Sequence, residues 1–258
     1  MKRAFLPLTV VLLAFLALTA ASCRSGPKED PILRLAAGES LAQGKELMAK
    51  KKYPRARPYF THAFEVEPNS GVGREGLLLA ADTYYLEGGS ANYIQSEAKY
   101  RDYLNRFPTS AQAPYVQFQI ANSLAKRMEK PDRDQNVTRK AQEAYQELIR
   151  LYPTSEYAQQ AQEQIKLVKA NLAEHEFQIG RFYLRYGLPP AAVERFNFLL
   201  ATYPDYPDKG KVYYHLGLAH QKMHHTEEAE KAFQLLRTEA PNSRWIAEIP
   251  ELKNGASK

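Results

Sequence analysis

The residues in this chain that could ligate a metal or attack a substrate are few, and their spacing argues against both roles. His175 and Glu176 begin as a zinc-protease helix motif does, but its fifth position is Ile179, so the second histidine ligand on that helical face is missing. His215 and His220 lie five residues apart, whereas two ligands on one helical face need a spacing of four. The sequence also contains no glycine-rich phosphate loop and no serine in a nucleophile elbow. We therefore predict no enzymatic activity, no catalytic residue, no metal and no dissociable cofactor.

Cys23 is the only cysteine among 258 residues, and its position indicates covalent chemistry of another kind. A basic start precedes the apolar run Ala4–Ala21, as in an export signal. A serine and then Cys23 follow directly, which resembles the lipobox of bacterial lipoproteins, although Ala20 stands where leucine is usual. The resemblance implies that residues 1–22 are a signal peptide and that Cys23 carries a diacylglycerol. The alternative is an ordinary signal peptide cleaved near this point, with Cys23 incidental.

The residues after Cys23 indicate where the folded part of the chain would lie. Arg24, rather than aspartate, follows the cysteine, and in lipobox proteins this fits sorting to the outer membrane. The resemblance thus implies a chain held by its lipid on the periplasmic face of the outer membrane of a Gram-negative bacterium. Residues 23–34 contain one glycine and two prolines and lack apolar periodicity, so we expect them to form a tether.

The charge of the chain does not indicate a nucleic-acid partner. The formal net charge is +6, or +4 once Lys2 and Arg3 are removed with the signal peptide. Basic residues are interspersed with acidic ones, for example Lys126 and Arg127 beside Glu129. This pattern is typical of solvated helix faces and not of a nucleic-acid interface.

Five prolines stand at recurring positions, namely Pro68, Pro108, Pro153, Pro204 and Pro241. Counting back from the first, fourth and fifth of them, a phenylalanine occurs eight residues upstream, an alanine twelve and a glycine twenty-four. This is the pattern of tetratricopeptide repeats, helix-turn-helix units of about 34 residues. The small residues let paired helices approach, the aromatic ring fills the gap between them, and the proline ends the helix. The sequence therefore predicts an all-α tetratricopeptide-repeat α-solenoid of about five units.

The spacing of the prolines is unequal, and the longer intervals predict two irregular features. Successive prolines are 40, 45, 51 and 37 residues apart. The 51-residue interval holds the proline-free segment Ser155–Tyr186, with apolar residues in steps of two to five. It predicts one helix of about 30 residues, roughly 45 Å long, that joins the two halves of the solenoid. The 45-residue interval holds the polar segment Pro131–Asn136, which is either an ordered, partner-facing loop or a solvated loop.

These features predict the organisation of the chain. Residues 35–154 are predicted to form an N-terminal half with units 1–3. Residues 155–245 would hold the long helix and units 4 and 5, and residues 246–258 would be a tail. A longer turn is expected at Gly88-Gly89-Ser90, and Thr226 is expected to cap a helix. The other predicted helices are 39–50, 54–67, 74–87, 93–106, one from Pro189-Pro190 to 202, 209–223 and 226–239.

The first helices of the N-terminal units are candidates to line a concave groove for an extended peptide. Tyrosines there offer stacking area with a polar tip. The alternative is that these residues pack between helices, since the chain has 17 tyrosines to accommodate. The candidate groove residues are Leu41, Lys45, Met48, Tyr84, Tyr85, Tyr115 and Gln119.

Several blocks of sequence carry a more specific resemblance. They are Arg133-Asp134-Gln135, Ala141 to Ala158, Leu172-Ala173-Glu174-His175-Glu176-Phe177, Phe182-Tyr183 and Ala191-Ala192-Val193-Glu194-Arg195-Phe196. From about Leu35 to Trp245 the chain resembles the BamD family, also called the ComL or YfiO family, lipoproteins of the outer-membrane β-barrel assembly (BAM) machinery.

The resemblance implies a non-enzymatic scaffold with two kinds of partner. Its N-terminal repeats would bind unfolded outer-membrane protein precursors, and its C-terminal repeats would dock on the periplasmic domains of the central barrel subunit. Accessory lipoproteins are further partners in such a complex. Arg195 matches an arginine that the family uses in the docking contact; the alternative is a plain surface charge.

Two other classes of function remain as alternatives. The first is another outer-membrane tetratricopeptide lipoprotein, acting in pilus assembly or cell-envelope constriction, which would lack the Arg-Asp-Gln segment and the long helix. The second is an envelope enzyme fused to repeats, for which the short stretch after Pro241 leaves little room.

Overall fold

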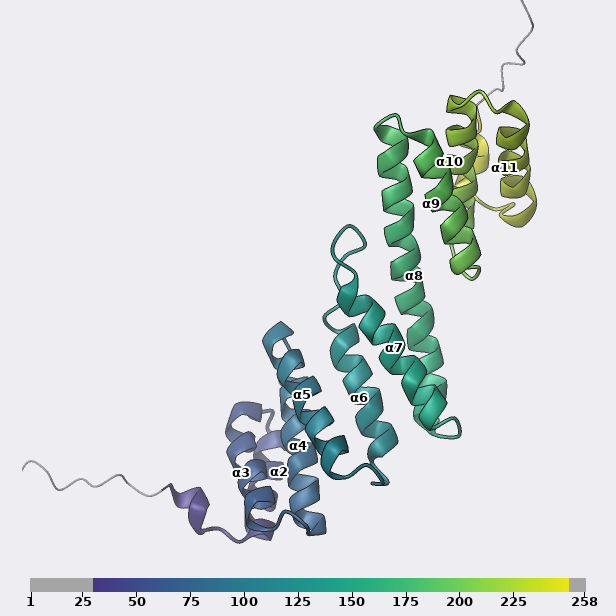
Figure 1. Ribbon diagram of the computed structural model, residues 1–258. Coiled ribbons are helices and arrows are strands. Elements are labelled where there is room, and N and C mark those ends of the chain that lie inside the picture. The colour runs from purple at the N-terminus through teal and green to yellow at the C-terminus, as the bar shows by residue number, and fades with distance from the viewer. Residues whose placement is uncertain (1–29, 251–258) are drawn as a thin grey trace, which may run out of the picture.

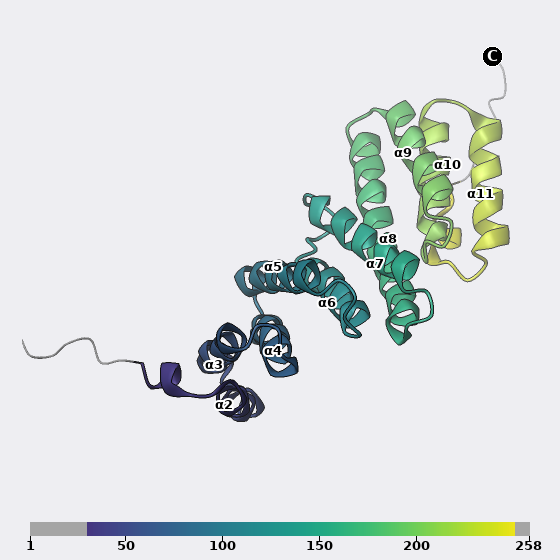
Figure 2. The ribbon, with the colours of Figure 1, turned by 60° about the horizontal axis from the view of Figure 1, so that its bottom comes forward.

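The computed structural model describes residues 30–250, and all regular structure in this range is helical. Successive helices run antiparallel and each packs on the next along the chain, which gives an elongated stack (Figure 1; Figure 2). The elements are η1 (Pro31–Arg34), α2 (Ala37–Ala49), α3 (Tyr53–Val66), α4 (Gly71–Glu87), α5 (Ser90–Arg106), α6 (Ala113–Ala125), α7 (Asn136–Leu151), α8 (Glu156–Arg185), α9 (Pro189–Thr202), α10 (Lys209–Lys222), α11 (Thr226–Glu239) and η2 (Arg244–Glu248).

The repeat pattern is confirmed by contacts between the paired helices of three units. These are unit 1 (α2 and α3), unit 4 (the second half of α8, with α9) and unit 5 (α10 and α11). A Cβ built on the recurring glycine of each unit would lie 2.4 to 2.6 Å from a phenylalanine Cε1, closer than real Cβ atoms come. Only glycine therefore fits opposite these rings. The pairs are Gly44 with Phe60, Gly180 with Phe196, and Gly217 with Phe233.

Units 2 (α4 and α5) and 3 (α6 and α7) fill the same space with tyrosine. Tyr100 and Tyr145 are fully buried, and each hydroxyl donates a hydrogen bond to a polar side chain of the first helix of its unit. Tyr100 bonds Asp82 at 2.6 Å, and Tyr145 bonds Asn122 at 2.7 Å. The pairing satisfies hydroxyls that would otherwise be buried without a partner.

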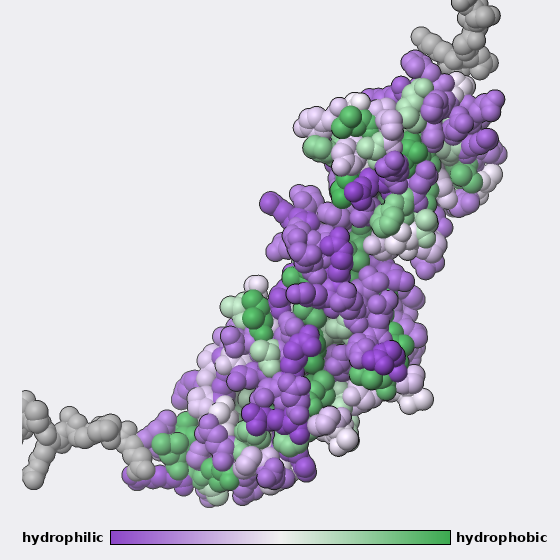
Figure 3. Space-filling view, in the orientation of Figure 1, coloured by the Kyte–Doolittle hydropathy of each residue, from purple (hydrophilic) through white to green (hydrophobic). Residues whose placement is uncertain are grey.

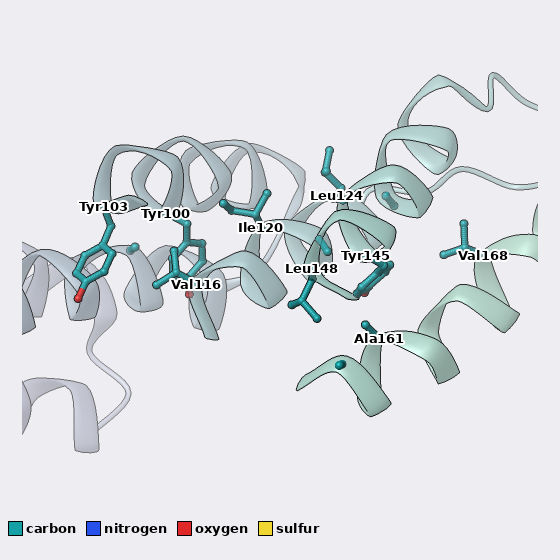
Figure 4. Close-up of a cluster of buried hydrophobic side chains, with 14 of the residues drawn as sticks. Tyr100, Tyr103, Val116, Ile120, Leu124, Tyr145, Leu148, Ala161 and Val168 are labelled. Carbon is teal, nitrogen blue, oxygen red and sulfur yellow. The ribbon is translucent and has the colours of Figure 1, made fainter. Parts of the chain in front are cut away.

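The long helix predicted between the halves is confirmed as α8, which has 30 residues. Its buried side chains belong to two different cores. Those up to Leu172 pack in the cluster of the middle units, shown in Figure 4, and those from Ala173 onward pack with α9 and α10. A third cluster holds unit 1. The boundary between the core of the middle units and the core of the C-terminal half therefore falls within one continuous helix.

The Pro131–Asn136 segment is ordered and packs on α8. Gln135 is buried, and its Nε2 donates to the carbonyl oxygens of Lys130 at 2.8 Å and Arg133 at 3.0 Å. His175 Nδ1 of α8 donates to the Pro131 carbonyl oxygen at 2.6 Å. The loop is therefore held from within and from the long helix.

Two local predictions are wrong. The turn between α4 and α5 contains only Gly88 and Gly89, both with positive φ (77° and 87°), because Ser90 already begins α5. Thr226 does not cap α11; the N-cap is His225, which makes no side-chain capping bond, and Thr226 is the first helical residue.

Cys23, the signal peptide and the last eight residues lie outside the described part of the chain. Between residues 30 and 250, no helix combines the length and the apolar character needed to cross a membrane.

Candidate functional site

The N-terminal half contains a hollow of about 510 Å³ on the side of the stack formed by α4 and α6. Most of its residues come from α4 at helical spacing, so they share one face of that helix. The start of α8 and the turn after α5 close the hollow. Its lining is Gly71, Arg74, Glu75, Leu78, Leu79, Asp82, Tyr103, Ser110, Gln112, Tyr115 and Tyr157.

Asp82 is the buried polar group of this hollow. Its Oδ1 accepts hydrogen bonds from the hydroxyls of Tyr100 at 2.6 Å and Tyr115 at 2.9 Å. No ion pair to Asp82 occurs among residues 30–250. Burial raises the pKa of Asp82, and the two tyrosine hydroxyls counteract that rise only in part. Burial also raises the pKa of Tyr100 and of Tyr115, so both phenols stay protonated donors.

A chain of hydrogen bonds continues from Asp82 across the middle units. Gln119 Nε2 donates to the Tyr115 hydroxyl at 3.0 Å, and Asn122 Nδ2 donates to Gln119 Oε1 at 2.8 Å. The Tyr145 hydroxyl then donates to Asn122 Oδ1 at 2.7 Å. The network links α4, α6 and α7 and holds the aromatic wall of the hollow in one arrangement.

The remaining lining combines aromatic rings with charged groups at the rim. The rings of Tyr115 and Tyr157 meet edge to face at 5.8 Å. Glu75 forms an ion pair with Lys45 at 2.6 Å, and the Arg74 guanidinium lies 5.8 Å from the centre of the Phe107 ring. A concave surface of rings with a few fixed polar groups suits binding of an extended peptide.

Arg195 lies in the other half of the molecule, on α9. Its Nη1 is 3.1 Å from Glu176 Oε2 of α8. The arginine side chain is about half exposed, whereas the glutamate side chain is largely covered. The guanidinium is thus positioned by its partner and remains accessible from solvent.

The sequence match to known proteins covers both of these regions. The model of the YfiO family, described as outer membrane lipoprotein, matches residues 36–236. The chain belongs to the YfiO family. The matched range includes every lining residue of the hollow as well as Arg195 and Glu176.

Two curated YfiO-family relatives are each named outer membrane protein assembly factor BamD. The protein from Rickettsia prowazekii is 27% identical over 205 residues, covering 80% of this chain and 80% of its own. The protein from Caulobacter vibrioides is 25% identical over 211 residues, covering 82% of this chain and 68% of its own. Among solved structures, the TPR2AB domain of yeast Sti1 is similar with a TM-score of 0.44 and 17% identity, covering 80% of this chain and 78% of that one.

Three of the predicted groove residues of this YfiO-family chain lie at the hollow or next to it. Tyr115 lines it directly. Gln119 supports the Tyr115 hydroxyl, and Lys45 is paired with the lining residue Glu75.

The other four predicted groove residues have packing roles and do not line the hollow. Leu41 is buried in the core of unit 1, and Met48 packs against the same core. The Tyr84 ring lies under the Arg57 guanidinium, 3.8 Å from its centre. Tyr85 packs against the core of the middle units. Peptide binding by the predicted set as a whole stays a prediction.

The α4 face that supplies most of the lining of the hollow is absent from the predicted groove residues. Arg74, Leu78 and Asp82 follow one another at steps of four, which places them on one side of a helix. Asp82 follows the apolar stretch Leu77–Ala81 directly. A carboxylate in such a place requires buried hydrogen-bond donors. The position of Asp82 after an apolar stretch was therefore the feature of the sequence that could have indicated this site.

Proposed function

We propose that this chain is a non-enzymatic scaffold lipoprotein of the outer-membrane β-barrel assembly complex. The observation that carries the proposal is the YfiO match over residues 36–236, together with relatives named as outer membrane protein assembly factors. The elongated all-helical stack of residues 30–250 supports it, because a solenoid presents long surfaces on which several partners can assemble.

The hollow of the N-terminal half is proposed to bind unfolded outer-membrane protein precursors. Such precursors expose extended segments with aromatic side chains, and the rings of Tyr103, Tyr115 and Tyr157 offer them stacking area. The buried network around Asp82 supports the role, since a prearranged wall lowers the entropy cost of binding.

The C-terminal half is proposed to dock on the periplasmic domains of the central barrel subunit through Arg195. The pairing with Glu176 supports this role, because it orients a guanidinium that can still reach a partner carboxylate. The lipid expected on Cys23 would hold the chain on the periplasmic face of the outer membrane, where accessory lipoproteins could join.

Affinity isolation of the chain from gently solubilised membranes tests the proposal. We expect a large outer-membrane barrel protein with periplasmic repeats to co-isolate with the wild type. Arg195→Glu should lower its recovery several-fold, because two like charges would face each other across the contact. Arg101→Glu, at an exposed arginine of α5, is the matched control and should leave recovery unchanged. Recovery of the wild-type chain without such a partner would refute the assembly role.

The anchor is tested separately with Cys23→Ala. We expect the variant to be released as a soluble periplasmic chain, since no lipid can be attached to alanine. Unchanged retention in the membrane fraction would mean that the lipid is not the anchor.

A further inference from the structure

The second half of α8 has a side that no other helix of residues 30–250 covers. Helix α7 has 16 residues and α8 has 30 residues. At a rise of about 1.5 Å per residue, α7 is roughly 20 Å shorter than α8. The two helices are antiparallel and joined at the lower end of α8 in Figure 1, so α7 stops about halfway along α8. Beyond that point α9 packs on α8 from the other side, as Figure 2 also shows.

A docked loop closes the lower end of this uncovered side. His175 binds the Pro131 carbonyl, and Asn171 Nδ2 donates to the Glu129 carbonyl oxygen at 3.2 Å. Above the loop is a hollow of about 330 Å³. Its floor is formed by one stripe of α8 that includes Ile179. The loop thus fills the space beside α8 where α7 is no longer present. The recess lies next to this loop, farther along α8.

Large aromatic side chains are exposed on this side, which we name the α8 shelf (Ile179, Arg181, Phe182, Arg185 and Tyr186). Phe182 is 54% exposed and Tyr186 is 65% exposed. Their rings are one helical turn apart, with centres 4.4 Å from each other, and form a single apolar ridge. Figure 3 shows hydrophobic surface at this upper end of α8. An exposed aromatic ridge beside a recess is typical of an interaction surface.

The geometry of the repeat indicates what kind of element fits the shelf. Elsewhere the first helix of a unit packs against the second helix of the preceding unit, as α4 does on α3, α6 on α5 and α10 on α9. The second half of α8 is the first helix of unit 4, and its preceding second helix, α7, does not reach it. The docked loop occupies the lower part of this length, up to His175. From there about ten residues of α8, roughly 15 Å, remain before the helix ends at Arg185. The vacant place therefore has room for a helix of about three turns.

The charge at the shelf indicates the composition of that helix. Arg181 and Arg185 are exposed one turn apart, and neither forms an ion pair within residues 30–250. Of the described residues, Asp132 is the only acidic one that lines the recess. Unpaired guanidinium groups beside an apolar ridge favour carboxylates on the partner.

We propose that the α8 shelf docks an amphipathic helix of about 10 residues from a partner protein, with apolar residues facing Phe182 and Tyr186 and with Asp or Glu facing Arg181 and Arg185. The helix would occupy the place that α7 leaves empty. This interaction is separate from peptide binding in the N-terminal hollow and from the Arg195 contact, and it does not depend on the proposed function.

Site-specific photo-crosslinking in the full-length chain, in its own membrane, tests this proposal. Benzoylphenylalanine is placed at Phe182, at Tyr186 and, as a control, at Leu167 of the same helix, which is 62% exposed. We expect crosslinks from 182 and 186, but not from 167, to one partner segment. Sequencing of the crosslinked peptide should place it in a helix-forming stretch with apolar residues at steps of three and four and with Asp or Glu beside them.

Charge reversal provides the second arm. Arg181→Glu with Arg185→Glu should reduce the crosslink yield from Tyr186 at least fivefold. Lys166→Glu with Lys169→Glu makes the same charge change on α8 and should leave the yield unchanged. Far-ultraviolet circular dichroism and the fluorescence of the single tryptophan, Trp245, check that both variants fold.

The proposal is overturned if neither position crosslinks to protein, or if position 167 gives the same product. It is also overturned if the product is lipid, a second copy of this chain or an extended, non-helical segment, or if charge reversal has no effect on the yield.

Discussion

The outer units and the middle units of the solenoid fill the space between their paired helices by different chemistry. In units 1, 4 and 5 a phenylalanine ring sits on a glycine, as Phe196 does on Gly180. In units 2 and 3 a tyrosine takes the place of the phenylalanine and donates its hydroxyl to Asp82 or Asn122. The outer contacts depend on shape alone, whereas the middle contacts need a polar partner on the facing helix.

This difference explains why the candidate site lies in the middle of the N-terminal half. A polar atom that accepts the hydrogen bond of a buried tyrosine can also bind a side chain at the surface. Asp82 does so, because its Oδ1 also accepts a hydrogen bond from Tyr115, which lines the hollow. A glycine–phenylalanine contact has no such group to offer. In the middle units the same polar side chain thus serves both helix packing and the lining of the hollow.

Two carboxylates extend the comparison to electrostatics. Asp82 is bound by tyrosine hydroxyls and has no cation partner among residues 30–250, so burial raises its pKa. Glu174 of α8 is bound by Lys211 and by the Tyr206 hydroxyl. Burial alone would raise the pKa of Glu174 too, but these bonds outweigh it and lower the pKa.

Removing a ring from an outer unit should have the largest effect on stability. Phe196 is fully buried, so Phe196→Ala should lower the free energy of unfolding by about 3–5 kcal/mol. Urea unfolding followed by circular dichroism, with Trp245 fluorescence as a probe of unit 5, measures the loss. Phe198 is on the exposed side of the same helix, and Phe198→Ala should cost less than about 1 kcal/mol. Equal losses would mean that the buried ring does not hold unit 4 together.

Crowding the contact between a glycine and a phenylalanine ring should lower the free energy of unfolding by less than Phe196→Ala does. A Cβ at position 217 would meet the Phe233 ring at 2.4 Å. Gly217→Ala should therefore cost about 1–3 kcal/mol in the same unfolding experiment. Adding Phe233→Leu to Gly217→Ala should recover part of the loss, because the smaller side chain gives room. A Cβ at Gly38 has no atom within 4 Å. Gly38→Ala should instead be neutral or gain up to about 1 kcal/mol. A harmless Gly217→Ala would refute the close-packing account of the outer units.

Removing one hydroxyl from a middle unit should cost less again. Tyr145→Phe keeps the ring but removes the hydroxyl that donates a hydrogen bond to Asn122 Oδ1. The expected loss is about 0.5 to about 1.5 kcal/mol, as for a typical intramolecular hydrogen bond. Tyr186→Phe is the control, because that ring is mostly exposed. It should change stability by at most about 0.5 kcal/mol. If the two variants behave alike, the buried network does not stabilise the middle units.

The smallest expected effect is on the pH dependence of stability. Because the folded-state pKa of Asp82 is raised, its contribution to stability is present below its unfolded pKa and is lost as pH rises through the folded-state pKa. Asp82→Asn should flatten the stability curve in that window. Glu174, with its lowered pKa, contributes above its unfolded pKa and loses that contribution as pH falls through the folded-state value, so Glu174→Gln should flatten the curve at the acid end. Urea titrations from acid to neutral pH measure both slopes. The same pH window for both variants would contradict the comparison.

Much of the fold could be predicted from local pattern. The offsets of glycine, alanine and phenylalanine before the prolines determined the pairing of helices in units 1, 4 and 5, because these residues act within one hairpin. The absence of proline between residues 155 and 186 and the recurrence of apolar residues predicted α8 with nearly correct ends. Predictions failed where a single residue decides a boundary, as at Ser90 and Thr226, since turn geometry and capping depend on neighbours in space.

The sequence by itself determined the repeat class, the long helix, the YfiO resemblance and the candidate lipid site at Cys23. Only the tertiary structure decided which face of α4 lines the hollow, where two cores divide along α8 and which side of that helix stays uncovered within residues 30–250. The physical reason is the distance along the chain over which each effect acts. Helical periodicity places side chains around one axis. Their exposure depends on where a different segment stops, as the loop before α7 does where Glu129 and Pro131 bind Asn171 and His175.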